Sequence, residues 1–399
     1  MANRNLTAAK LAKNDEFYTQ YPDIEKEINA YLEFDPDTFR GKVVYSNCDD
    51  PYESNFFRYF VLNFKRLGLK QYIATSYKPS PIANTQLELF GGNGVAMQQK
   101  GRPKQTANKF VINDVGDMDG DGRFTLEDIA EQVKTNKNNE WEPLEGDGDF
   151  RSQECIDLLM QADIVVTNPP FSLFREYLGQ LVEHEKQFLI IGNMNAITYK
   201  EVFPLIKDDR LWLGNGFQGG NAYFQTPSVR DDFASGVFDE ATGLVKFRNV
   251  VWFTNIDHGR RHQPLSLMSM EDNRKFNKKL IGTPAYKTYD NFEGIEVPYT
   301  DAIPIDYDGV MGVPISFLDK YNPEQFEIVG TTEGFSGTPS TKTYSKKVRV
   351  VDGVEKKSNT GTMSGVIRED EYGAGTFFNV GYPVRAVYKR IFIRHRRSE

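Results

Sequence analysis

The sequence predicts an α/β fold, with a doubly wound sheet in the first half of the chain and a β-rich region in the second half. Short runs of Val, Ile and Leu without polar alternation are typical of the central strands of a parallel sheet that is covered on both faces. Segments with apolar residues at helical spacing separate these runs. From about residue 205 onward, glycine and aromatic residues alternate and the helical periodicity fades.

The strands and helices of the first half are expected in a regular order. Strands are predicted at residues 43–45, 72–74, 164–166 and 188–191. Between them, helices are predicted from Ser54 to Leu67, after a cap at Ser152, and from Leu173 to Glu185. In open α/β sheets, ligands bind at the carboxyl ends of the strands, so the residues that follow these runs are the first candidates for a site.

A chain of 399 residues predicts two domains. We expect the first at residues 1–204, with inserted segments at about 78–105 and 109–145, and the second at residues 205–399. The segment 78–105 is rich in Pro, Gly, Asn and Gln, which favours a long excursion from the sheet.

Charge and composition limit the class of protein. The net charge is −8, but it is uneven: residues 111–163 carry 15 acidic and 4 basic residues, and residues 340–399 carry 13 basic and 6 acidic residues. A basic face for nucleic acid and an unevenly charged solvated surface are alternatives at this point. The chain has no apolar stretch of roughly 20 residues and no signal-like start, so we expect no membrane segment. Its two cysteines suit a cytoplasmic protein with reduced thiols.

The tetrapeptide Asn168-Pro169-Pro170-Phe171 directly follows the apolar run at residues 164–166. The side-chain oxygen of Asn168 and the carbonyl of Pro169 can accept from the two N–H bonds of a planar amine, and consecutive prolines stiffen the turn that holds them. The ring of Phe171 can stack on an extruded base. This pattern predicts methyl transfer from S-adenosylmethionine to an exocyclic amine and favours that of adenine in DNA. The alternative is an ordinary turn at the end of a strand.

Three segments are candidates for the cofactor site. Carboxylates in Ser46-Asn47-Cys48-Asp49-Asp50-Pro51 could hold the amino group of the methionine moiety. In the segment 146–150, Asp149 could accept from the adenine amine of the cofactor while Phe150 packs on its ring. Tyr18 and Thr19 could close over the cofactor. Each segment has a plainer interpretation as a turn or a helix lead-in, and the Gly-x-Gly of many nucleotide sites is absent at the first of them.

These motifs stand in one order and resemble the EcoRI-type adenine-specific DNA methyltransferases. The resemblance rests on residues 15–20, 47–51, 54–57, 146–152, 167–171 and 312–323. It implies a Rossmann-like domain that binds S-adenosylmethionine, methylation of adenine at N6, base flipping, and target recognition largely C-terminal to the tetrapeptide. It also implies a cofactor site lined by Tyr18, Thr19, Asp49, Asp50, Asp149 and Phe150, and a target-base site lined by residues 168–171.

The acidic segment from residue 117 to residue 128 has the spacing of a calcium loop. Candidate ligands at the template positions are Asp117, Asp119, Asp121, Arg123, Thr125 and Asp128, with glycine at the sixth position. Asp128 stands where the template has glutamate, one methylene longer. A structural calcium ion and a solvated acidic turn without metal remain alternatives.

Double-stranded DNA is the expected partner. Basic candidates for DNA contacts are Arg260-Arg261-His262, the Lys-rich stretch 342–357, and the tail with Lys389, Arg390, Arg394, Arg396 and Arg397. Two rival functions remain. One is a methylase of another planar amine: cytosine N4, an RNA base or a glutamine side chain. The other is a non-catalytic DNA-binding or calcium-regulated module. The sequence leaves open the recognition sequence, a partner nuclease and the oligomeric state, a monomer included.

Overall fold

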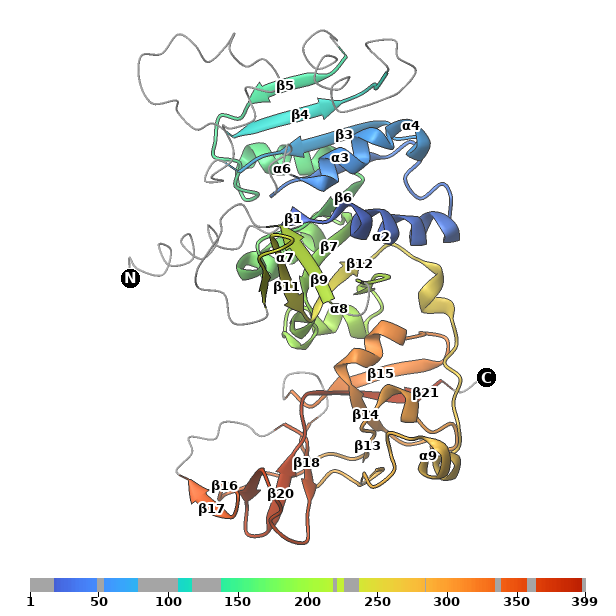
Figure 1. The fold of residues 1–399 in the computed structure, drawn as a ribbon, viewed down its shortest axis with the longest axis vertical. Coiled ribbons are helices and arrows are strands. Elements are labelled where there is room, and N and C mark those ends of the chain that lie inside the picture. The colour runs from blue at the N-terminus through green and yellow to red at the C-terminus, as the bar shows by residue number, and fades with distance from the viewer. Residues whose placement is uncertain are drawn as a thin grey trace. The chain divides into compact units, whose positions relative to one another are not determined.

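The computed structural model describes residues 18–48, 54–77, 107–116, 138–217, 221–225, 237–283, 285–333, 339–356 and 364–396 (Figure 1). The chain forms two compact units. The first contains residues 1–194 and 213–259, and the second contains residues 195–212 and 260–399. Residues 213–259 therefore fall in the first unit. The division of roles into a catalytic part at 1–204 and a target-recognition part at 205–399 stays a prediction.

An eight-stranded mixed sheet forms the first unit, in the order β5-β4-β3-β2-β6-β7-β12-β8. Its four middle strands are parallel, as the apolar runs predicted: β3 (Gln71–Thr75), β2 (Val43–Ser46), β6 (Ile164–Thr167) and β7 (Gln187–Asn193). Antiparallel strands flank them: β4 (Asn108–Ile112) and β5 (Glu140–Pro143) on one side, β12 (Val250–Thr254) on the other. The sheet ends at β8 (Trp212–Leu213). We expected an inserted segment at 109–145. Its described ends form β4 and β5, which extend the sheet. The other expected insertion, at 78–105, lies outside the described residues.

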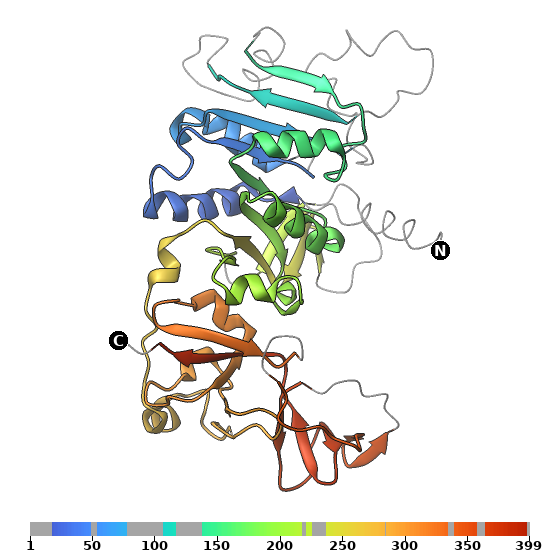
Figure 2. The ribbon, with the colours of Figure 1, turned by 180° about the vertical axis from the view of Figure 1, so that it is seen from behind.

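Helices cover both faces of this sheet. Figure 1 shows α2 (Tyr21–Phe34) and α3 (Asn55–Leu62) in front of it, and Figure 2 shows α6 (Gln153–Gln161) and α7 (Phe174–Glu183) on the other side. The caps explain where two of them begin. Ser54 accepts a hydrogen bond from the amide of Phe56, and Ser152 accepts from the amide of Cys155. The predicted helix 54–67 is divided at Asn63, after which α4 (Phe64–Leu67) follows.

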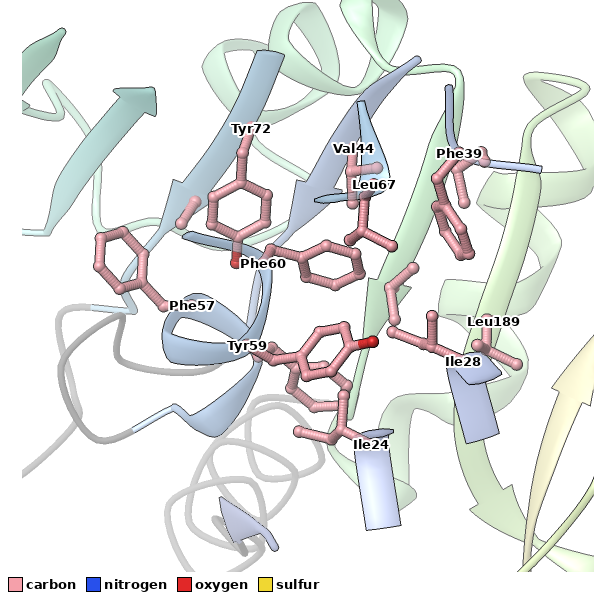
Figure 3. Packing of buried hydrophobic residues seen from close by; sticks show 14 of the residues in the cluster. Ile24, Ile28, Phe39, Val44, Phe57, Tyr59, Phe60, Leu67, Tyr72 and Leu189 are labelled. Atoms are coloured by element: carbon pink, nitrogen blue, oxygen red, sulfur yellow. The ribbon is translucent and has the colours of Figure 1, made fainter. Parts of the chain in front are cut away.

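The core of the first unit lies between α2, α3 and the sheet (Figure 3). Phe60 and Tyr72 are fully buried, and their rings stack with centroids 5.2 Å apart. Ile24 and Ile28 of α2 pack into the same cluster. Each such side chain contributes about 1.5–3 kcal/mol of hydrophobic free energy, which fixes both helices against the sheet.

A second, antiparallel sheet of the first unit has the order β1-β9-β11-β10. Its strands are β1 (Tyr18–Thr19), β9 (Asn221–Gln225), β11 (Leu244–Arg248) and β10 (Phe238–Asp239). The first strand comes from the start of the described chain, and the others come from residues beyond 205. This sheet therefore joins two segments that are about 200 residues apart.

The second unit is β-rich. One sheet has the order β13 (Ile295–Glu296), β14 (Met311–Pro314), β21 (Arg390–His395) and β15 (Phe326–Thr331). Another has the order β17 (Val354–Lys356), β16 (Val348–Val351), β19 (Thr376–Asn379), β20 (Pro383–Ala386) and β18 (Val366–Arg368). Among its described residues, the α-helices of this unit are α8 (Phe203–Lys207) and α9 (Met270–Phe276). Short 3-10 helices occur at Met194–Thr198, Gly259–His262, Thr300–Ala302 and Ile315–Lys320. Over the residues described, no helix combines the length and the apolarity that a membrane span needs.

Candidate active site

The carboxyl ends of the neighbouring strands β2 and β6 are fastened to each other. Their register pairs Tyr45 with Val165. Just beyond this pair, the hydroxyl of Ser46 donates to the carbonyl of Val166 at 2.7 Å, and the hydroxyl of Thr167 donates to the carbonyl of Asn47. All of these side chains are buried. Residues 46–48, the described part of the segment 46–51, therefore leave the sheet beside residues 168–171.

The tetrapeptide has the strand–turn–helix context that its chemistry requires. Asn168 is only 6% exposed and directly follows β6, and Pro169 is buried while Pro170 is half-buried. Phe171 opens the 3-10 helix η2 (Phe171–Leu173), whose turn is closed by the amide of Leu173 donating to the carbonyl of Pro170. Helix α7 follows at once. The short rigid connection holds Asn168 and Phe171 at the carboxyl edge of the sheet.

The end of β2 turns sharply beside the tetrapeptide. Cys48 has a φ of +73°, in the left-handed region that costs a non-glycine residue roughly 1–2 kcal/mol. The side-chain oxygen of Asn47 accepts from the hydroxyl of Tyr177 in α7, so Asn47 is tied to the helix that follows the tetrapeptide. Burial raises the pKa of Tyr177 well above its ordinary value, which keeps this hydroxyl a donor. Asp49 and Asp50 lie outside the described residues.

Gly148 fixes the place of the third candidate segment. Its φ is +78°, and a Cβ at this position would lie 2.0 Å from the carbonyl oxygen of Ser76, just beyond β3. Only glycine allows this approach, so the segment 146–150 lies against the carboxyl end of β3. The buried ring of Phe150 meets the ring of Tyr177 edge-on at 5.0 Å.

Asp149 is held by Arg151. The guanidinium donates to both carboxylate oxygens at 2.8 and 2.6 Å, and the amide of Arg151 donates at 2.9 Å. Partial burial opposes the charged form of Asp149, but the bonds and the charge of Arg151 outweigh it and hold the pKa of the carboxyl below its ordinary value. Asp149 is therefore a fixed carboxylate. Two of the three bonds from Arg151 go to Oδ1 and one goes to Oδ2, so Oδ2 keeps acceptor capacity for a further donor.

Tyr18 and Thr19 form β1 and are buried. The side-chain amide of Asn55 donates to the carbonyl of Thr19 at 2.8 Å, which anchors the strand to the start of α3. The hydroxyl of Thr19 is buried and has no hydrogen-bond partner among the described residues. A buried hydroxyl without a partner costs free energy, which makes it a candidate ligand contact.

Phe224 connects β1 with the tetrapeptide. It pairs with Thr19 in the β1–β9 ladder, and its ring lies edge-on to Phe171 with centroids 6.4 Å apart. Phe247 of β11 meets Phe171 at 6.1 Å and Phe224 at 5.6 Å. Sequence reasoning missed both residues because it assigned everything beyond 205 to target recognition. The local signal in the sequence was the short alternation of residues 221–225, whose burial also alternates in the structure.

The structure brings most of the predicted site together at one edge. The ends of β2, β3 and β6 carry Asn47, Asp149 with Phe150, and residues 168–171, and Phe224 links β1 to them. The acidic segment 117–128 lies outside the described residues. Within the part of the chain that the structure describes, no group of three His, Cys, Asp or Glu side chains could hold a metal ion.

Comparison with known proteins identifies the family of this chain. A family model described as "Adenine-specific methyltransferase EcoRI" matches residues 5–396. The Type II methyltransferase M.EcoRI of Escherichia coli is 43% identical over 335 residues, covering 83% of this chain and 90% of that protein. The Type II methyltransferase M.MpnI of Mycoplasma pneumoniae is 35% identical over 324 residues, covering 80% and 83%. No solved structure matches the chain.

Proposed function

This chain belongs to the EcoRI family of adenine-specific methyltransferases, and we propose that the side chains at the carboxyl edge of its sheet carry out the family's reaction. The enzyme is a site-specific DNA methyltransferase that transfers a methyl group from S-adenosylmethionine to the exocyclic N6 amine of adenine. The observation that carries the assignment of residues is the position of Asn168-Pro169-Pro170-Phe171 at the end of β6, between two other strands of the parallel core.

Asn168 and Pro169 are proposed as the acceptors for the adenine amine. The lone pair of this amine is delocalised into the ring, so the nitrogen is a poor nucleophile. Two acceptors aimed at its N–H bonds favour a more tetrahedral nitrogen and direct the lone pair toward the methyl group. No general base is required before transfer, because the proton can leave afterwards. The contribution of the protein is then mainly positioning.

Phe171 is proposed as the surface on which the flipped adenine stacks. The ring is half-buried, and Phe224 and Phe247 contact it edge-on. An aromatic ring held in this way cannot tilt freely, so a face is preset for the base. Stacking of a base on an aromatic side chain is worth about 1–3 kcal/mol, which offsets part of the cost of extruding it from the duplex.

The cofactor site is proposed to contain Tyr18, Thr19, Asn47, Asp49, Asp50, Asp149 and Phe150, in a Rossmann-like arrangement. The donor set fits S-adenosylmethionine: a fixed carboxylate, a buried hydroxyl without a partner among the described residues, and an aromatic ring. When bound, the cofactor supplies a methyl group on a sulfonium. Asp149 would accept from the adenine amine of the cofactor, Phe150 would pack on its ring, and the buried hydroxyl of Thr19 would gain a partner.

Two further assignments stay proposals. Residues 205–399 would supply target recognition, apart from the strands β9–β12 that pack in the catalytic unit. The segment 117–128 would hold a structural calcium ion. Calorimetric titration with millimolar calcium tests this loop, and wild-type protein without a binding signal would remove the ion from the proposal.

The reaction is tested with labelled S-adenosylmethionine and unmodified genomic DNA, followed by mapping of the methylated base. We expect label at N6 of adenine within one recognition sequence and none on structured RNA. Asn168→Ala should lower the rate of transfer by about 10²–10³-fold, the typical cost of removing one preorganised electrostatic contact. Full activity of this variant would remove Asn168 from the catalytic site.

A further inference from the structure

Two groups of basic residues in the second unit bear on DNA binding. The first group is paired inside the unit. Arg390 donates to Glu296 at 2.9 and 2.6 Å, Arg260 to Asp319 at 3.0 Å, and Arg394 lies 3.6 Å from Glu327. Arg390 and Arg394 stand in β21, an inner strand of its sheet. These cations belong to the basic tail and to the segment at Arg260, which the sequence predicted as DNA contacts. In the structure they pair with carboxylates of the same unit.

The second group lies on one face of the five-stranded sheet. Residues that pair directly across antiparallel strands point to the same face. The pairing runs from Lys356 to Arg349 and Phe378, and then through Val384 to Arg368. Lys356, Arg349 and Arg368 are exposed. With adjacent strands about 4.8 Å apart, this row is roughly 19 Å long. It is called the cationic row below.

Charge is separated between the two faces of this sheet. The strand residues on the face of the cationic row include three cations and no carboxylate. The opposite face carries Glu355, and Arg385, whose guanidinium bonds Glu369 at 3.1 Å. None of the three cations of the row has a carboxylate partner among the residues that the structure describes. The strand residues on the face of the cationic row therefore contribute positive charge only.

The middle of the row is stiffened by an aromatic cluster. Tyr344 and Tyr382 both donate to Asp290, at 2.6 and 2.7 Å, and Lys342 donates to the same carboxylate at 2.9 Å. Hydrogen bonds from Tyr344, Lys342 and Tyr382 overcome partial burial and keep the pKa of Asp290 below its ordinary value. The guanidinium of Arg368 lies over the ring of Tyr382, 4.6 Å from its centroid. Arg368, at one end of the row, therefore projects from a fixed platform.

We propose that the cationic row of Lys356, Arg349 and Arg368 binds the phosphate backbone of the DNA duplex. The spacing suits this partner: Arg349 and Arg368 are three strands apart, roughly 14 Å, which is close to the 12 Å width of the major groove. Phosphate contacts of this kind position the enzyme on any sequence and do not read bases. The proposal rests on the assigned DNA methyltransferase activity and adds the surface that holds the duplex.

The test is the salt dependence of DNA binding. Each phosphate contact contributes about −0.9 to the slope of log K against log salt concentration. The slope of the triple variant Arg349→Gln/Lys356→Gln/Arg368→Gln should therefore be less negative than the wild-type slope by about 2.7. When salt is raised from 50 to 200 mM, the loss of DNA affinity should then be about 40-fold smaller than for the wild type. The rate of methyl transfer at saturating DNA and low salt should stay at the wild-type value, because the row is not part of the proposed catalytic site.

A matched triple variant controls for net charge. Lys200→Gln/Lys279→Gln/Arg394→Gln removes the same charge from exposed side chains of the same unit that are paired with Glu201, Asp301 and Glu327. Its slope should stay near the wild-type value. Equal slopes for the two triple variants overturn the proposal. So does an unchanged slope for the single variant Lys356→Gln, whose position in an exposed edge strand avoids a folding defect. Wild-type protein that fails to methylate DNA would instead contradict the proposed function.

Discussion

Replacing Phe224 by leucine tests whether the ring of Phe171 must be held for methyl transfer. Phe224 is fully buried, and its ring lies 5.6–6.4 Å from those of Phe171, Phe217 and Phe247. Each aromatic pair is worth about 0.5–1.5 kcal/mol beyond area burial, so the variant should lose about 1.5–4.5 kcal/mol of folding stability. A displacement of Phe171 on the order of 1 Å should also lower the transfer rate by about 10²-fold.

A matched substitution separates the two effects. Phe60 is also fully buried in the first unit and packs against three rings, those of Phe39, Tyr59 and Tyr72, but none belongs to the tetrapeptide (Figure 3). Phe60→Leu should lower the melting temperature as much as Phe224→Leu and leave the rate unchanged below the melting transition. The assay is single-turnover methyl transfer, together with the fluorescence of 2-aminopurine placed at the target base. A wild-type rate and wild-type fluorescence for Phe224→Leu would refute the reasoning, as would an equal loss of rate for Phe60→Leu.

Three further substitutions probe the cofactor side. Thr19→Val removes a buried hydroxyl that has no partner among the described residues, so the free energy of unfolding should not fall. The Kd for S-adenosylmethionine, measured by calorimetry, should rise about 2–12-fold, which is the equivalent of one lost hydrogen bond. Gly148→Ala forces a Cβ against the carbonyl of Ser76 at positive φ. The free energy of unfolding in urea should fall by at least about 1–3 kcal/mol, and cofactor binding should weaken. Wild-type values for both quantities would contradict the role given to Gly148. Arg151→Gln removes the group that lowers the pKa of Asp149 in the folded protein. The wild type should therefore be more stable than this variant, and the difference in the free energy of unfolding should be complete above pH 3.8, the ordinary pKa of this carboxyl. The difference should shrink as the pH falls through the lower pKa of the folded state. A difference in stability that does not depend on pH between 7 and 3 would exclude this linkage.

Much of the first unit was predictable because it depends on local patterns. The four apolar runs predicted the parallel strands, and the resemblance carried by the tetrapeptide and the segments around it predicted the family that the comparisons confirm. The start of α6 followed from Ser152, whose side chain caps the first turn. In each case the deciding interaction lies within a few residues of the motif, where side-chain type and spacing are enough.

The other parts depend on pairing between distant segments. The pairing of β1 with β9, and of β12 with β7, places these strands in the first unit, and no local pattern at residue 205 reveals it. The same holds for the charges: Arg390 and Lys356 look alike in the sequence, but only Arg390 meets a buried carboxylate.

The sequence by itself determined where the central strands lie along the chain and predicted the chemistry of the tetrapeptide, because backbone propensity and side-chain type act over short distances. The tertiary structure alone decided which aromatic rings steady Phe171 and which cations remain available to a duplex. Both depend on which distant strands become neighbours, and that choice is made by the burial of whole faces and not by any single segment.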